Sequence, residues 1–227
     1  MTALVLASAL FVGIHVAIAG TRLRDALVAA LGERGYLGGF SLLSIGALTW
    51  MIMSYAAAPR APLWITPGWL RDLAMLGVLA AVVLAVIGLI TPSPTVTGGA
   101  AALDRDDAAR GILRVTRHPF LTGVAAWAAM HLLLNGDGAS LVFFGALLIL
   151  ALIGPPSIDA KRRRAFGARW ERFAARTSIV PFAAIAAGRA PFVISEIGLW
   201  RIAVAGLAAL ALLVFHGRLF GVPALPF

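Results

Sequence analysis

The chain has 227 residues, of which 61% are hydrophobic and only 13% are charged. A soluble core of ordinary size could not bury that much apolar surface, so lipid must cover part of it. The absence of cysteine excludes disulfides, thiolate metal sites and cysteine nucleophiles. The formal net charge of +9 comes largely from arginines in short loops between apolar runs, which is typical of membrane orientation and not of nucleic-acid binding.

Six apolar stretches are each close to the roughly 20 residues that a helix needs to cross a bilayer. They cover residues 1–21, the segment between Arg34 and Arg60, residues 73–90, 118–134, 139–154 and 197–215. The first stretch has no basic start, so we expect a retained helix rather than a cleaved signal peptide. The sequence predicts an all-α, polytopic membrane helix bundle of about six transmembrane helices, in a single domain over residues 1–227.

The connections between the later spans carry clear turn signals. Asn135-Gly136-Asp137-Gly138 predicts a tight antiparallel hairpin between the fourth and fifth spans, with Asn135 capping the fourth helix. Residues 159–177 predict a short cytoplasmic amphipathic helix, with aromatic residues on one side at Phe166, Trp170 and Phe173. Residues 179–185 are too short to span, and whether residues 179–195 are interfacial or re-entrant stays open.

The basic residues divide unevenly between the two sides of the predicted bundle. With the N-terminus outside, fifteen of the 19 arginines and lysines fall in inner loops, whereas Arg60, Arg71 and Arg218 fall outside and Arg201 lies at a boundary. This bias predicts a multi-pass protein of the cytoplasmic (inner) membrane with its N-terminus outside. The expected partners are the lipid bilayer and, at the basic loops, anionic lipid headgroups; no nucleic acid is expected.

Two histidines lie inside predicted spans, His15 in the first and His131 in the fourth. Ionisable residues in a bilayer usually face the bundle interior and have a partner or ligand. Two neutral imidazoles on different helices can hold b-type haem, whereas hydrogen bonds to neighbouring carbonyls would be an ordinary structural role; both alternatives stay open. Counted from the flanking arginines, the depths of His15 and His131 in the membrane differ by roughly 10 Å. A haem shared by the two histidines therefore needs tilted helices or a tilted ring.

The densest polar motif is LRVTRHP at residues 113–119. Arg114, Arg117 and the N-terminus of the fourth span together predict an anion site for a lipid phosphate, a carboxylate or a nucleotide-like cofactor. Alternatively, these arginines only anchor the loop at the membrane surface. Three nearby carboxylates could also pair with them and close the loop: Asp104, Asp106 and Asp107.

Two strings, ILRVTRHPFLTGVAAWAAMHLLLNGD and FGARWERFAARTSIVPFAAI, together with the first-helix histidine, resemble the NnrU family of bacterial membrane proteins over most of the chain. The resemblance implies an association with nitrite and nitric oxide reduction. It extends to the zeta-carotene cis-trans isomerases, membrane enzymes whose b-type haem is held by two histidines. The matching ligands here would be His15 and His131, which implies an isomerase-like or redox role and a small hydrophobic substrate.

A more distant resemblance to the isoprenylcysteine carboxyl methyltransferases rests on the Arg-His-Pro helix entrance and the FG-x-x-W segment. It implies S-adenosylmethionine binding by Arg117 and His118 near Trp170. The acidic pair usual before the FG segment is replaced by DAKRRR starting at Asp159, which weighs against methyl transfer. Three classes therefore stay open: a haem-dependent isomerase or oxidoreductase, a methyltransferase, and a non-enzymatic membrane factor for nitric oxide reduction.

Overall fold

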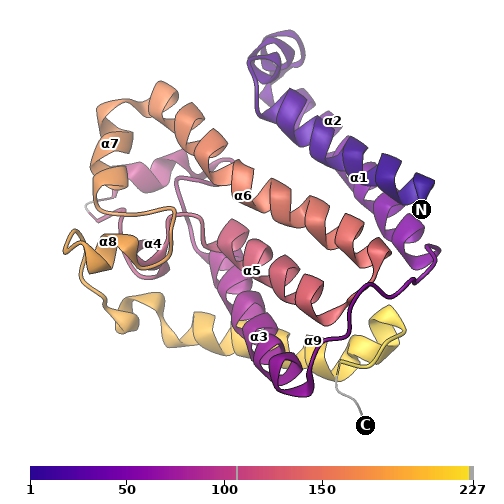
Figure 1. The fold of residues 1–227 in the computed structure, drawn as a ribbon. Coiled ribbons are helices and arrows are strands. Elements are labelled where there is room, and N and C mark those ends of the chain that lie inside the picture. Colours follow the sequence, from indigo (N-terminus) through magenta and orange to yellow (C-terminus); the bar gives the residue numbers. More distant parts are fainter. Residues whose placement is uncertain (106, 225–227) are drawn as a thin grey trace. The chain divides into compact units, whose positions relative to one another are not determined.

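The computed structural model describes residues 1–105 and 107–224 (Figure 1). Asp106, one of the carboxylates expected near the arginine motif, lies outside them. In the described residues all regular elements are helical, apart from an isolated bridge between Pro62 and Asp137. The all-α prediction is therefore confirmed. The chain forms two compact units: unit 1 is Met1–Met75 with Ala128–Gly154, and unit 2 is Leu76–Trp127 with Pro155–Phe227.

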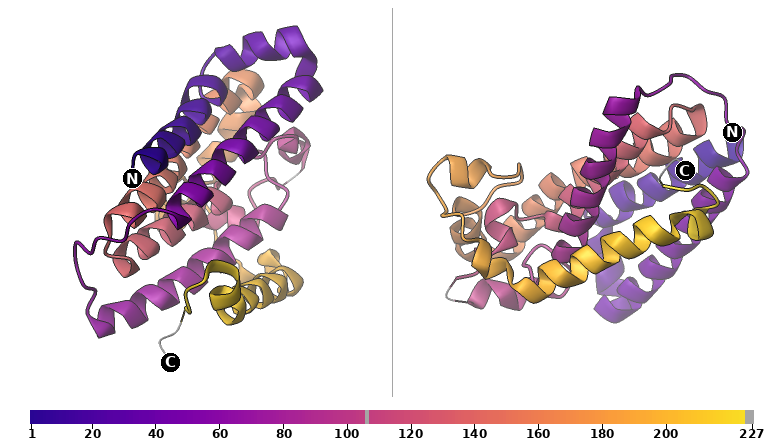
Figure 2. Two further views of the ribbon diagram at one scale, coloured as in Figure 1. Left: turned by 90° about the vertical axis from the view of Figure 1, so that its right-hand side faces the viewer. Right: turned by 90° about the horizontal axis from the view of Figure 1, so that it is seen from below.

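Unit 1 begins with α1 (Thr2–Ile14), which passes directly into one turn of π-helix, η1 (His15–Ala19). The next helix, α2 (Leu23–Ala56), is broken at Gly32, whose φ of 72° suits glycine and few other residues. The break separates a short arm before Gly32 from a long arm after it. Figure 2 shows α1 running beside the long arm, which it contacts closely.

Four further apolar helices are α3 (Gly68–Ile90), α5 (Pro119–Leu134), α6 (Gly138–Phe166) and α9 (Leu199–Phe220). Among the described residues, five helical segments are long and apolar enough to cross a membrane, and α5 is a shorter apolar helix of 16 residues. These six elements correspond to the six predicted spans. Large side chains such as Leu42, Leu76 and Leu89 are exposed, as a lipid-facing surface requires. The chain is a multi-pass membrane protein.

Within unit 2, α3 and α5 approach until their backbones touch. A Cβ atom on Gly88 of α3 would overlap the backbone of Phe120, and a Cβ atom on Gly123 of α5 would overlap the backbone of Ala85. Small residues at such crossings let membrane helices pack closely, because lipid provides little hydrophobic drive for association. This crossing fixes the start of α5, where the LRVTRHP motif ends.

The predicted amphipathic helix is present but shorter than residues 159–177. Residues 159–166 belong to α6, which continues through Pro155 and Pro156. Gly167, with φ 49°, then separates α6 from α7 (Ala168–Ala175), where Trp170 and Phe173 are both buried. The remaining short elements are η2 (Gly99–Asp104), α4 (Ile112–Val115), α8 (Ala183–Ala186) and η3 (Ile194–Ile197). Helix α6 therefore continues beyond Gly154, the predicted end of the fifth span, since prolines are tolerated inside membrane helices.

Candidate functional site

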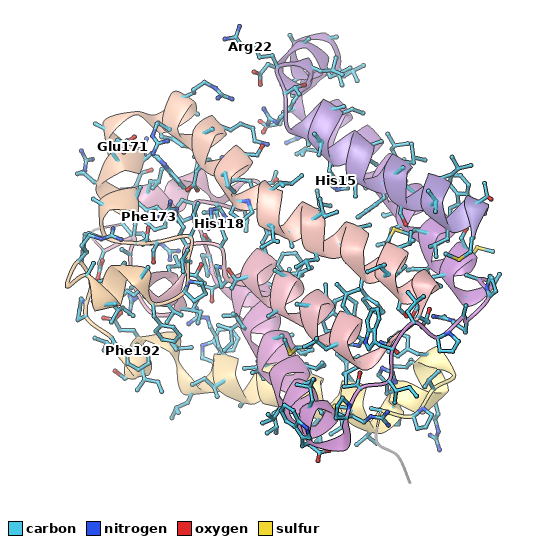
Figure 3. The ribbon with its side chains drawn as sticks, viewed as in Figure 1. His15, Arg22, His118, Glu171, Phe173 and Phe192 are labelled. Carbon is cyan, nitrogen blue, oxygen red and sulfur yellow. The ribbon has the colours of Figure 1, made fainter. Side chains whose placement is uncertain are left out.

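His15 lies where α1 becomes the π-helical turn η1 (Figure 3). Its Nδ1 is 2.7 Å from the carbonyl oxygen of Phe11. A carbonyl oxygen only accepts, so Nδ1 carries the hydrogen and a neutral ring keeps its lone pair on Nε2. The rings of Phe11 and Phe40 lie 4.6 Å and 5.2 Å from the imidazole, centroid to centroid. An imidazole fixed through one nitrogen by a carbonyl is the usual arrangement of a metal-ligating histidine, and single π-helical turns often occur at functional sites.

His131 lies in the last turn of α5, within unit 1. Its ring stacks on Phe144 of α6 with 4.7 Å between centroids, and Phe144 contacts the ring of Tyr55 at 5.7 Å. The side-chain amide of Asn135 donates to the carbonyl of His131 at 2.9 Å, which confirms the predicted helix cap. His131 therefore belongs to an aromatic cluster at the end of α2.

The positions of these two histidines can be compared along the long arm of α2. His15 contacts Phe40, whereas the cluster of His131 contacts Tyr55, fifteen residues further along the same helical arm. At 1.5 Å per residue, Phe40 and Tyr55 are about 22 Å apart. Bonds from a metal to imidazole are only about 2 Å long. These contacts place the two imidazoles at different levels of the long arm of α2, and the shared haem between the first and fourth spans stays a prediction.

A polar network adjoins the His131 cluster. The hydroxyl of Tyr55 lies 2.9 Å from Oγ of Ser140, and the Ser140 hydroxyl donates to Asp137 at 2.7 Å. Asp137 also accepts from the backbone N–H of Ser140 at 2.9 Å and so caps the start of α6. The Arg60 guanidinium lies 3.9 Å from the centre of the Tyr55 ring. The network joins α2 to α6 and holds the aromatic cluster in place.

In unit 2, Arg117 and His118 share one carboxylate, that of Asp159 in α6. Nε2 of His118, labelled in Figure 3, is 2.7 Å from Oδ1, and the Arg117 guanidinium donates to Oδ2 at 2.8 Å and 2.5 Å. The side chains of His118 and Asp159 are 1% and 7% exposed, and that of Arg117 is 11% exposed. The three residues form a buried, internally paired cluster at the entrance to α5.

The two strings that carry the family resemblance meet at this entrance. The backbone N–H of Arg117 donates to the carbonyl of Ser178 at 2.9 Å, and that of Phe182 donates to Val115 at 2.8 Å. The hydroxyl of Thr116 donates to the carbonyl of Ile179 at 2.9 Å. The segment after α7 is therefore hydrogen-bonded along the turn that leads into α5, so the two strings contact each other in the fold.

Arg114 is paired elsewhere in unit 2. Its guanidinium donates to Asp107 at 2.8 Å and to Glu196 at 3.0 Å, and its side chain is only 6% exposed. The expectation that a nearby aspartate would pair with these arginines is confirmed for Asp107. The structure does not bring Arg114 and Arg117 to a common anion, because each is held by its own carboxylates. Their role in cofactor binding stays a prediction.

Two carboxylates of these clusters, Asp159 and Glu196, were not predicted as site residues. Asp159 is 41 residues from His118 in sequence and stands beside the KRRR run, where it resembles an ordinary surface charge. The available signal was its position as a lone carboxylate at the end of an apolar span, where a buried partner is usual. Glu196 likewise stands alone before the last span, 82 residues from Arg114.

The comparisons with known proteins agree with this architecture. Two plant proteins named 15-cis-zeta-carotene isomerase, chloroplastic, from Arabidopsis thaliana and Zea mays, are each 35% identical to the chain over 79 residues. The match covers 35% of this chain and 22% of each plant protein. No solved structure matches. The protein-family model described as NnrU protein matches residues 3–224. The chain therefore belongs to the NnrU family.

Proposed function

We propose that this chain is a membrane-embedded isomerase-like protein that acts on a small, apolar substrate. The observation that carries the proposal is the similarity of 79 residues to two enzymes named as isomerases of 15-cis-zeta-carotene. The chain spans about a fifth of the length of those enzymes, so the activity and the substrate are both part of the proposal. A substrate of that class is apolar and would reach the protein from the lipid phase.

The residue that we propose at the centre of the site is His15, which would hold b-type haem through its imidazole. The hydrogen bond from Nδ1 to Phe11 leaves Nε2 as the ligating atom. When bound, haem would supply an iron able to interact with an unsaturated substrate or a gas. Phe11 and Phe40 contact the imidazole ring and help to keep it oriented. His131, at the other end of the long arm, would act in the aromatic cluster and not on this iron.

A matched pair of substitutions tests the isomerase proposal. In His15→Phe and His131→Phe the aromatic contacts are retained and only the ring nitrogens are lost. Membranes that contain the wild-type chain are supplied with 15-cis-zeta-carotene, and the isomers are separated chromatographically. We expect conversion by the wild-type chain and by His131→Phe, with loss of conversion in His15→Phe. A wild-type chain that is folded and haem-loaded yet converts none of the carotenoid would refute the proposal.

The link to nitrite and nitric oxide metabolism is a further proposal on the same site, because a position left open on haem iron also binds nitric oxide. Nitric oxide titrated into the purified protein should then shift its absorption bands. A non-enzymatic role in nitric oxide reduction would instead appear as a stable partner in mild-detergent pull-down, without isomerase activity. The structure offers no observation in favour of methyl transfer, since Arg117 and His118 are both held by Asp159.

A further inference from the structure

A small cavity lies in unit 2 between the loop after α3 and the start of α9. It has a volume of about 190 Å³, and its lining includes Thr91 and Pro92 after α3 and Glu196 and Arg201 near the start of α9. Both helices are long enough to span a membrane, so the cavity lies where they leave the hydrocarbon region. This volume is below the roughly 300–1,000 Å³ of pockets for drug-sized ligands and suits a headgroup-sized ligand.

The cavity carries an excess of positive charge. Among the residues that the structure describes, which leave out residue 106, two carboxylates line it, Asp107 and Glu196, and three arginines line it, Arg105, Arg110 and Arg201. Both carboxylates are already paired with arginines outside the lining. Arg114 binds both of them, and Arg176 lies 3.1 Å from Asp107. The guanidinium groups of the three lining arginines are therefore not neutralised by these two carboxylates.

Glu196 lines the cavity and is held by hydrogen bonds from two other groups. One of its carboxylate oxygens accepts from the backbone N–H of Gly111 at 2.8 Å, and the other accepts from Arg114 at 3.0 Å. Gly111 has φ 57°, and a Cβ atom there would press on the carbonyl of Glu196. This close approach needs glycine, and it holds the start of α4 against η3 before any ligand arrives.

Arg201 supplies an unused donor at the cavity. Its Nη1 donates to the carbonyl of Ile197 at 3.1 Å, and its guanidinium lies 4.6 Å from the ring of Trp200. Its Nε is buried and has no hydrogen-bond acceptor in the part of the chain that the structure describes. A buried guanidinium N–H without an acceptor is costly, so a ligand oxygen at this point would be favoured.

We propose that this cavity binds a phosphate group, with Arg105, Arg110 and Arg201 as its ligands. Arginine is suited to phosphate because its planar fork of donors matches the spacing of phosphate oxygens. The phosphate can come from the headgroup of an anionic lipid, since the cavity lies at a membrane surface, or from a soluble phosphate compound. The site shares Asp107 and Glu196 with the Arg114 cluster, but Arg114 itself does not line the cavity, and Arg117 is held by Asp159.

The test compares two double variants of the full chain with equal loss of charge. Arg105→Gln with Arg110→Gln removes two exposed cavity arginines, and Arg164→Gln with Arg172→Gln removes two exposed arginines of α6 and α7 that do not line it. Each protein is purified from vesicles of phosphatidylcholine doped with phosphatidic acid, and retained lipid is counted by native mass spectrometry. Binding of inorganic phosphate is measured separately by calorimetry.

We expect the cavity variant to bind its phosphate ligand about tenfold or more weakly, since each charge-assisted hydrogen bond contributes measurably, while the control variant is unchanged. Selective retention of phosphatidic acid identifies a lipid source, and binding of inorganic phosphate identifies a soluble one. Equal losses in both variants, or no loss in the cavity variant, would overturn the proposal, because general surface charge would then explain any binding.

Discussion

Nε2 of His118 lies 2.7 Å from Oδ1 of Asp159, and Arg117 holds the other oxygen of the same carboxylate. This contact ties the entrance of α5 to α6 across 41 residues of sequence. All three side chains are almost completely withdrawn from solvent. A buried ion pair of this kind makes a protein little more stable than apolar residues of the same size would. Removing one partner, however, strongly lowers the free energy of unfolding, because the other charge stays buried and unpaired.

Replacing Asp159 with alanine should therefore destabilise the protein by about 3–5 kcal/mol, because it leaves the Arg117 charge buried without a partner. The control is Glu171→Ala, which breaks an exposed pair with Arg163 at 2.5 Å and should cost about 1 kcal/mol or less. Thermal unfolding in detergent measures both. Equal losses in the two variants would show that the Asp159 cluster is not buried as described.

The crossing of α3 and α5 gives a second prediction. Gly123→Ala should lower the free energy of unfolding by about 1–3 kcal/mol, since the new methyl group overlaps the backbone of Ala85. At Gly145 in α6 an added methyl group would meet no atom within 4 Å, so Gly145→Ala should stabilise the helix by about 0.5–1 kcal/mol. Opposite signs in the two unfolding curves are expected, and a neutral Gly123→Ala would contradict the close crossing.

The cap of α6 gives a third prediction. Asp137→Ala removes the acceptor for the Ser140 N–H and should cost about 0.5–2 kcal/mol, whereas Asp137→Asn should retain most of the stability because asparagine caps helices nearly as well. The measurement is again the unfolding midpoint in detergent. If Asn and Ala were equally harmful, the ion pair with Arg60 would be more important than the cap.

The orientation predicted from the basic loops can be checked because the chain has no cysteine. Single cysteines at the exposed Ala61 and Ala165 would report the two sides of the membrane. With the N-terminus outside, a membrane-impermeant maleimide should label Ala61→Cys in intact spheroplasts and Ala165→Cys only after permeabilisation. The reverse labelling pattern would show that the N-terminus faces the cytoplasm.

Elements with strong local signals were predicted well. The bounds of α5 agree with the sequence because Pro119 suits a first helical turn and the Asn-Gly pair at 135–136 ends the helix. The course of α6 through Pro155 and Pro156 could not be predicted, since two prolines normally indicate a break. Prolines are nevertheless tolerated inside membrane helices, because neighbouring helices can provide hydrogen bonds for the backbone carbonyl groups that a proline leaves without a partner.

The candidate sites were harder to predict because their partners are distant in sequence. The choice of His15 as a constrained imidazole followed from its position in a span, but the π-helical turn at His15–Ala19 has no proline or other marker. The relative levels of His15 and His131 were hard to predict, since counting from flanking arginines ignores where each helix begins relative to its neighbours. In the structure His15 contacts Phe40 of α2, whereas His131 stacks on Phe144, which contacts Tyr55 of α2.

The most direct test of the proposed haem site at His15 is an absorption spectrum of the purified protein, recorded with and without dithionite after expression with supplied haem. We expect a Soret band that shifts on reduction in the wild-type chain and in His131→Phe, and no such band in His15→Phe, with all three proteins equally folded. A spectrum without haem bands in the wild-type chain, or one that persists in His15→Phe, would contradict this assignment.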